Sequence, residues 1–208
     1  MIQGILFDYD GTLAKTMYHH YKAWKQTLVD FNTNFSKEEY YNLEGFSLYL
    51  LPSLITKQNI TKKKIEELVV IKKKFFKKNF KKVNYYSNTL KILRYLKLKK
   101  IKIALVSSSH LDQIISSSKK NFLNNFDAII SGEDTKNNKP SPDPYLLGLK
   151  KLKLKPKNCL VIENAPIGII SAKKAGLKTI AITNTLDRKY LLNADIIINN
   201  IIELKKYL

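Results

Sequence analysis

The sequence predicts an α/β protein in which a parallel sheet domain carries a helical insert directly after its first strand. Three observations predict this fold class. A short apolar run ends in two aspartates and a Gly-Thr turn within residues 4–13, helical periodicity dominates residues 16–82, and from residue 87 apolar runs alternate with helix-like segments. Strands that alternate with helices form βαβ units, which make the strands parallel and cover both faces of the sheet.

The first predicted strand ends at a pair of aspartates. The apolar run GILF (4–7) leads into Asp8 and Asp10, and alternation along an extended chain turns both carboxyl groups to the same side. Two like charges in this arrangement cost free energy unless a cation lies between them. The pair therefore predicts a cationic partner at the end of this strand.

The predicted insert consists of helices. Apolar residues recur at helical spacing from about residue 16 to 31, SKEE (36–39) has the pattern of a capping box that opens a second helix, and a long third helix is predicted over 61–82. We expect residues 15–83 to form the insert. Residues 1–14 and 84–208 then form the sheet domain, which is long enough to bury a core.

Five further strands are predicted after the insert. They are the apolar runs IKIALVS (101–107), FDAII (126–130), CLVIE (159–163), KTIAIT (178–183) and DIIIN (195–199). In open parallel sheets, ligands bind outside the carboxyl ends of the strands. These ends add Ser107, the pair Glu163 and Asn164, and Lys139 in the loop after FDAII to the two aspartates.

This set of side chains suits a phosphoryl group bound together with a divalent cation. A hard cation such as Mg²⁺ prefers oxygen ligands and would offset the repulsion between a phosphate and an attacking carboxylate. On this interpretation Asp8 is a nucleophile that forms an aspartyl-phosphate, and Asp10 is the general acid and base. Ser107 and Lys139 would hold the phosphoryl oxygens.

Four stretches of the chain carry a family resemblance. FDYDGT (7–12), VSS (106–108), KPSPDPY (139–145) and VIENAPIGIISAKKAG (161–176) resemble, in this order, the four motifs of the haloacid dehalogenase-like (HAD) phosphohydrolase superfamily. The resemblance implies a Rossmann-like catalytic core, Mg²⁺ dependence and a small α-helical cap, which corresponds to the insert. It implies metal ligation by Asp8, Asp10, Glu163 and Asn164, and phosphate binding by Thr12, Ser107, Ser108 and Lys139.

Within the superfamily, the chain resembles the β-phosphoglucomutase and sugar-phosphatase branch. KTMYHHYKAWK (15–25) is similar to its hinge and first cap helix, which implies that Thr16 and His20 lie at the junction of cap and core. The cap loop LEGFSLYL (43–50) resembles the mutase specificity loop, and Tyr49 is a candidate substrate contact.

Three departures from the family pattern matter for function. Lys15 stands at the hinge where family members usually carry Asp, and the second acid of the last motif is replaced by Asn164. Because an amide oxygen brings no charge, we expect weaker Mg²⁺ binding. In the cap loop, Leu48 and Tyr49 stand where mutases tend to supply an arginine for the second phosphate, which favours a phosphatase.

The formal net charge of +20 raises a different hypothesis, binding to a polyanion. Only Arg94 and Arg188 of the 37 basic residues are arginine, whereas recognition of phosphates and guanine edges favours arginine. The lysines accompany many Asn, Ile, Tyr and Phe residues, as expected from an AT-rich genome. We interpret the densest stretch, Lys62–Lys82, as a solvated helix face and expect no specific nucleic-acid partner.

We therefore predict a Mg²⁺-dependent phosphatase that acts on a small phosphorylated metabolite, with a sugar phosphate as the favoured substrate class. The alternatives are a β-phosphoglucomutase and, less favoured, a non-catalytic polyanion-binding protein on the same fold. The chain runs into its first strand without a basic, apolar leader, and it has no apolar run of membrane-spanning length. We expect a cytoplasmic protein without a membrane partner.

Overall fold

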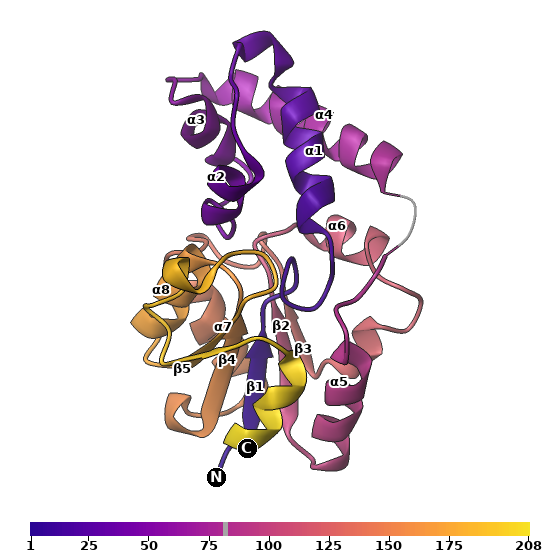
Figure 1. The fold of residues 1–208 in the computed structure, drawn as a ribbon, viewed down its shortest axis with the longest axis vertical. Helices are drawn as coiled ribbons and strands as arrows, with labels where there is room; N and C mark the ends of the chain where they lie inside the picture. Colours follow the sequence, from indigo (N-terminus) through magenta and orange to yellow (C-terminus); the bar gives the residue numbers. More distant parts are fainter. Residues whose placement is uncertain (81–82) are drawn as a thin grey trace.

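A computed structural model describes residues 1–80 and 83–208 and contains the predicted parallel sheet with flanking helices (Figure 1). The sheet has six strands in the order β3-β2-β1-β4-β5-β6. All five neighbouring pairs are parallel. The strands are β1 (Gly4–Phe7), β2 (Lys102–Val106), β3 (Ala128–Ile130), β4 (Cys159–Glu163), β5 (Lys178–Ile182) and β6 (Ile196–Ile198).

The first strand lies in the middle of the sheet. Phe7 of β1 is level with Leu105 of β2 on one side and with Ile162 of β4 on the other. Each predicted strand is present, with ends within two residues of the prediction. The carboxyl ends of β1, β2 and β4 are therefore adjacent, as the α/β prediction requires.

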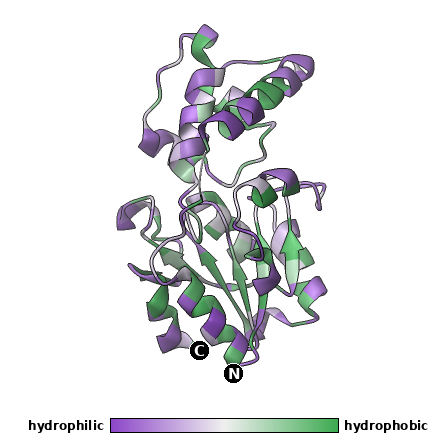
Figure 2. Cartoon of the chain, turned by 90° about the vertical axis from the view of Figure 1, so that its right-hand side faces the viewer, coloured by the Kyte–Doolittle hydropathy of each residue, from purple (hydrophilic) through white to green (hydrophobic). Residues whose placement is uncertain are grey.

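The alternation of side chains along β1 divides the core between two faces of the sheet. Ile5 and Phe7 pack with α5 (Thr89–Leu98) and the C-terminal 3-10 helix Ile201–Tyr207, whereas Leu6 packs with residues of α7 (Asp143–Leu152) and α8 (Pro166–Lys174). The strands are predominantly hydrophobic, and the helices alternate between hydrophobic and hydrophilic segments (Figure 2). The sheet is covered on both faces.

The helices after β1 form a body above the sheet, which we call the cap (Figure 1). The cap comprises α1 (Met17–Thr27), α2 (Lys37–Asn42), α3 (Leu51–Thr56) and α4 (Lys62–Asn79) with their connecting segments. Its apolar core is separate from the cores beside the sheet and surrounds Trp24. The domain boundaries at 14/15 and 83/84 stay a prediction.

The predicted helices of the cap are present with three differences. A 3-10 turn over Val29–Phe31 follows α1 where the prediction continued one helix. The short helix α3 was missed, because six residues are too few to show helical periodicity. The predicted end of the third helix at residue 82 lies outside the described residues, and α4 ends at Asn79. The capping box of Ser36 and Glu39 is confirmed.

Two chain crossings connect the cap to the sheet domain. Ala14 forms an isolated bridge with Tyr85, and the Lys15 N–H donates to the Asn84 carbonyl at 2.8 Å. The Lys15 ammonium lies 5.4 Å from the centre of the Tyr86 ring, within the range of a cation–π interaction. Lys15 therefore holds the outgoing segment against the returning one. Within the described residues, no helix is long and apolar enough to cross a bilayer.

The cap core generates a stability prediction at Trp24, which is fully buried and whose indole N–H has no partner. Trp24→Ala should lower the free energy of unfolding by about 3–5 kcal/mol, because it opens a large cavity. Trp24→Phe should cost clearly less, since it keeps most of the apolar volume and removes the unpaired N–H. Urea denaturation of both variants checks this, and equal losses would contradict it.

Candidate active site

The buried lysine Lys139 lies between two carboxylates at the carboxyl ends of the strands. Its ammonium donates to Asp8 Oδ1 at 2.8 Å, to Glu163 Oε1 at 2.7 Å and to the Val106 carbonyl at 3.1 Å. The Tyr145 hydroxyl also donates to Glu163 Oε1, at 2.7 Å. Lys139 is a cationic partner of Asp8, but it pairs Asp8 with Glu163 and not with Asp10 as the aspartate pair predicts.

The charges of this cluster are set by burial and by mutual attraction. Burial disfavours a charged Lys139, but the carboxylates of Asp8 and Glu163 outweigh it and raise the pKa of the ammonium. Burial raises the pKa of Asp8 to about 8 against the attraction of Lys139. Without a cation or phosphate present, Asp8 therefore holds a proton more readily than an exposed aspartate does.

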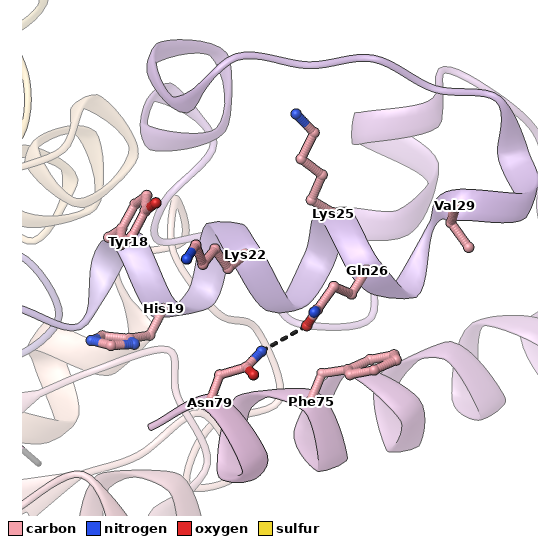
Figure 3. A pocket seen from close by; sticks show the side chains of 8 residues that line it. All are labelled: Tyr18, His19, Lys22, Lys25, Gln26, Val29, Phe75 and Asn79. Carbon is pink, nitrogen blue, oxygen red and sulfur yellow. Dashed lines mark hydrogen bonds between the residues drawn. The ribbon is translucent and has the colours of Figure 1, made fainter. Parts of the chain in front are cut away.

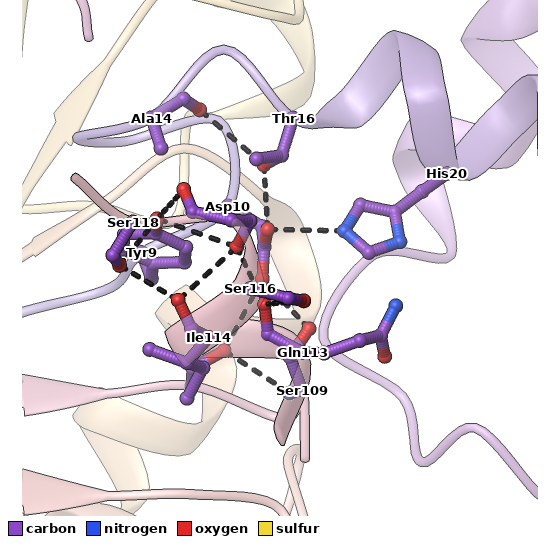
Figure 4. Close-up of polar contacts among 12 residues, drawn as sticks. Tyr9, Asp10, Ala14, Thr16, His20, Ser109, Gln113, Ile114, Ser116 and Ser118 are labelled. Carbon is purple, nitrogen blue, oxygen red and sulfur yellow. Dashed lines mark hydrogen bonds and ion pairs between the residues drawn. The ribbon is translucent and has the colours of Figure 1, made fainter. Parts of the chain in front are cut away.

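The carboxylate of Asp10 accepts hydrogen bonds from four side chains, among them Thr16, His20 and Ser109 (Figure 4). One oxygen, Oδ1, accepts from the Thr16 hydroxyl at 2.5 Å and from His20 Nε2 at 3.1 Å. The other, Oδ2, accepts from Ser109 Oγ at 2.8 Å and Ser107 Oγ at 3.3 Å. Burial opposes ionisation, but His20 and these hydroxyls hold the pKa of Asp10 well below its usual range. Asp10 is therefore a carboxylate.

A lysine of the cap completes this network. The Lys72 ammonium donates to His20 Nδ1 at 2.8 Å. Burial and this ammonium lower the pKa of His20 to about 4, so the imidazole is neutral at pH 7. Because an ammonium only donates, Nδ1 is the acceptor and Nε2 carries the proton that is donated to Asp10.

The interpretation of Lys62–Lys82 as a solvated helix face holds for the lysines at 62–64, 74, 77 and 78, which are exposed, and is wrong for Lys72. Lys72 is fully buried, and its ammonium lies 5.3 Å from the centre of the Phe76 ring. The burial of Lys72 was not predicted, because a run of lysines indicates a solvent-exposed surface. The available signal was its position four residues after Leu68 and four before Phe76, on the buried face of α4.

Asn164 fills the space beside Asp8. With its amide nitrogen facing the acceptors around it, Asn164 donates to Asp8 Oδ2 at 3.1 Å and to the Asp10 carbonyl at 3.2 Å, while its oxygen accepts from the Thr185 hydroxyl at 2.9 Å. A side chain at Gly11 would overlap this amide, since an ideal Cβ lies 2.3 Å from one of its two terminal atoms. The Thr12 hydroxyl contacts the same amide at 2.8 Å, so its predicted phosphate contact stays a prediction.

The remaining predicted residues have two different placements. Ser108 Oγ donates to the Gly45 carbonyl of the cap loop at 2.6 Å, so Ser108 joins cap and core. Tyr49 is 43% exposed, and the centre of its ring lies 6.0 Å from that of His110. The structure therefore brings together Asp8, Asp10, Thr12, Thr16, His20, Ser107, Lys139, Glu163 and Asn164, and leaves Tyr49 at the rim.

The oxygen atoms around Asn164 fit a hard cation better than the predicted carboxylates do. Among the described residues, no three or more His, Cys, Asp or Glu side chains are grouped to hold a metal ion. Asp10 directs its carboxylate elsewhere, and Glu163 is bound by Lys139. However, Asp8 Oδ2 and the Asp10 carbonyl both lie within hydrogen-bond distance of the Asn164 amide nitrogen. If that amide turned to present its oxygen instead, the three oxygen donors would suit Mg²⁺. The fit rests on the Asp10 carbonyl, not on its carboxylate.

A cavity of about 640 Å³ lies elsewhere, between α1 and α4 of the cap (Figure 3). A hydrogen bond of 2.6 Å from Asn79 to Gln26 links the two helices at its wall. The other lining residues are Tyr18, His19, Lys22, Lys25, Val29 and Phe75. The lining contains no carboxylate, so this cavity is not part of the cluster around Asp8.

The sheet order, the cap and the paired aspartates define a capped α/β enzyme of the phosphoryl-transfer class. A family model for haloacid dehalogenase-like hydrolases matches residues 5–182. The chain belongs to this family, which confirms the resemblance seen in the four motifs.

Named relatives agree with this assignment. A phosphorylated carbohydrates phosphatase of Thermotoga maritima is 28% identical over 204 residues, covering 93% of this chain and 91% of the relative. A pyrophosphatase of Bacillus cereus is 29% identical over 196 residues, covering 93% and 88%. A solved structure from Bacteroides vulgatus, assigned as a β-phosphoglucomutase, has a TM-score of 0.88 at 29% identity and covers 99% of this chain and 86% of that one. The predicted enzyme class, a HAD-type phosphatase or mutase, is confirmed at this level.

The Lys139 cluster generates a prediction about stability and pH. Lys139→Met should lower the free energy of unfolding by about 3–5 kcal/mol at pH 7, because it leaves two buried carboxyl groups unpaired. Burial already raises the pKa of Asp8 to about 8 beside Lys139. Without Lys139 the folded state holds protons that the unfolded chain releases near pH 4, so the loss should grow as pH rises above about 4 and shrink in acid.

This prediction is checked by urea denaturation of both proteins between pH 4 and 8 in the presence of chelator, so that no bound cation replaces the ammonium. Lys150→Met, at an exposed position of α7, is the matched control. A Lys139→Met variant whose stability follows the wild-type pH profile would contradict the assigned pairing.

Proposed function

We propose that this chain is a Mg²⁺-dependent phosphatase that hydrolyses a small phosphorylated metabolite, with a sugar phosphate as substrate, through an aspartyl-phosphate on Asp8. The observation that supports the proposal most strongly is that the two aspartates have different hydrogen-bond partners and neighbouring charges. Asp8 lies beside the buried ammonium of Lys139, whereas Asp10 is held as a carboxylate by four proton donors. One carboxyl group is placed for attack and the other for proton transfer.

In the first half-reaction, an Asp8 carboxylate oxygen attacks phosphorus, and the bond from phosphorus to the ester oxygen breaks. This step requires protonated Asp10, which gives its proton to the leaving oxygen; because Asp10 is a carboxylate in the free protein, that proton would be taken up as the substrate binds. In the second, Asp10 as a carboxylate takes a proton from water, whose oxygen attacks the phosphorus and releases Asp8. The second step requires Asp10 as a carboxylate that is hydrogen-bonded to a neutral His20. The lowered pKa values of both residues favour this state at pH 7.

Lys139 and Ser107 would stabilise the negative charge of the phosphoryl oxygens during both steps. Lys139 is fixed by Asp8 and Glu163, so its ammonium needs no reorganisation. Bound Mg²⁺ would be held by Asp8, the Asp10 carbonyl and Asn164, whose amide would turn to present its oxygen, and it would offset the repulsion between Asp8 and the phosphate. Thr16, His20 and Lys72 would orient Asp10.

A β-phosphoglucomutase is the second candidate, because the Bacteroides vulgatus structure assigned to that activity covers 99% of this chain at 29% identity. The two reactions share the aspartyl-phosphate and differ in whether water or a sugar hydroxyl accepts the phosphoryl group. In the cap loop, Leu48 is buried and Tyr49 is at the rim. Neither side chain supplies a cation for a second phosphate, which favours hydrolysis.

Phosphate release from a panel of sugar phosphates that includes β-glucose 1-phosphate tests the proposal. Turnover should require Mg²⁺, stop with chelator, and fall by at least about 10³-fold in Asp8→Asn, because the nucleophile is lost. Consumption of β-glucose 1-phosphate without phosphate release would favour the mutase. Salt-sensitive binding to nucleic acid that is indifferent to Asp8→Asn, with no turnover, would favour the non-catalytic alternative.

The amide at position 164 generates a separate prediction. Asn164→Asp should lower the Mg²⁺ concentration needed for half-maximal activity by about tenfold, because a carboxylate adds a charge to the oxygen cluster. In chelator the same variant should melt at a lower temperature, since a second carboxylate would face Asp8 Oδ2 in place of an amide donor at 3.1 Å.

Thermal unfolding with and without Mg²⁺ checks both effects alongside activity. Asn193→Asp, at an exposed position, is the matched control. An unchanged Mg²⁺ requirement together with an unchanged Mg²⁺-induced shift in melting temperature would remove Asn164 from the proposed ligands.

A further inference from the structure

The cap loop at residues 43–50 lies against the sheet domain on two sides of Gly45. On one side the Ser108 hydroxyl donates to the Gly45 carbonyl at 2.6 Å. On the other, an ideal Cβ on Gly45 would lie 3.3 Å from Ile167 at the start of α8. Gly45 also has a φ of +100°, which a residue with a side chain rarely adopts. Ser108 adjoins Ser107, and Ile167 follows Asn164 by three residues, so the loop reaches between two walls of the active site.

Glu44 precedes Gly45 and carries a carboxyl group into this space. Its Oε2 is buried and has no hydrogen-bond partner. The carboxyl lies close enough to Asp10, Asp8 and Lys72 for their charges to act on it, and Tyr40 contacts it from α2. A buried, unpartnered oxygen costs free energy, and a bound ligand that supplies a hydrogen-bond donor would remove this cost.

The surroundings of Glu44 define which chemical group complements it. The buried Oε2 of Glu44 can accept a hydrogen bond from a hydroxyl group in either protonation state of the carboxyl. Burial and the charges of Asp10 and Asp8 raise the pKa of Glu44, and in its protonated form the carboxyl also donates one hydrogen bond. A hydroxyl group matches both functions. A carboxylate or second phosphate would add a negative charge beside three acidic side chains, while the Lys72 ammonium is already bonded to His20.

We propose that Glu44 is the residue of the cap that selects the leaving group, favouring phosphate monoesters with a hydroxyl near the ester oxygen over those with a second anionic group there. The inference rests on the proposed function, because it places the leaving group between Asp10 and the cap. It extends that function by naming the group that separates polyol and sugar monophosphates from phosphorylated acids, pyrophosphate and bisphosphates. Leu48 and Tyr49 select only by lacking a cation, whereas Glu44 binds and excludes directly.

Two esters that differ in one group test this selection: 2-hydroxyethyl phosphate and 2-phosphoglycolate, in which CH₂OH is replaced by a carboxylate. The wild type should prefer the hydroxyl ester in kcat/KM. Glu44→Met should reduce that preference by at least about tenfold, mainly by slowing the hydroxyl ester, because it removes both hydrogen-bonding functions. Glu44→Gln should retain most of the preference, since an amide also donates and accepts.

The control is Glu66→Met, which makes the same change at an exposed position of α4 in the same cap. Binding of both esters is also measured by calorimetry in the Asp8→Asn background, with and without Glu44→Met. A preference that Glu44→Met leaves unchanged, or changes no more than Glu66→Met does, overturns the proposal. So does a failure of either ester to bind any variant at millimolar concentration.

This experiment distinguishes a failure of the proposed phosphatase function from a failure of the proposed role of Glu44. If Asp8-dependent hydrolysis persists while the preference ignores Glu44, the phosphatase stands and the role of Glu44 falls. If no ester is hydrolysed, the proposed function is wrong. The binding preference in the Asp8→Asn background then still shows whether Glu44 distinguishes the two leaving groups.

Discussion

The need to neutralise one fully buried lysine is the constraint on which the rest of this structure depends. A buried ammonium is stable only when nearby groups replace its lost hydration. For Lys139 these groups are Asp8 after β1, Glu163 at the end of β4 and the Val106 carbonyl in β2. One side chain therefore holds three adjacent strand ends together. The same pairing places a cation beside Asp8, the proposed nucleophile, before any substrate arrives.

The second aspartate couples the sheet domain to the cap. Its carboxylate receives hydrogen bonds from Ser107 and Ser109, which follow β2, from Thr16, which leads into the cap, and from His20 in cap helix α1. Lys72 on α4 then fixes the tautomer of His20. The surroundings of Asp10 are thus completed by residues of the cap.

The strands could be predicted because their signal is local. Short runs of β-branched and apolar residues between turn residues gave all six strands, and the two aspartates follow the first of them directly. The buried lysine of α4 and the acid of the cap loop could not be found in this way. Lys72 stands among charged neighbours, and Glu44 lies in a loop with no periodicity. Both residues are buried by elements that pack against them, and amino-acid composition does not predict that packing.

The sequence by itself determined the fold class and which side chains follow the strand ends, among them Asp8 as the proposed nucleophile, because each is encoded by residues adjacent in the chain. Only the tertiary structure decided that Asp10 offers its carbonyl toward Asn164 and its carboxylate toward His20, and that Lys72 and Glu44 enter the site. These features depend on how the cap, which has its own apolar core, packs over the sheet. The residues that make these contacts are far apart in the sequence, so a local sequence pattern does not predict the contacts.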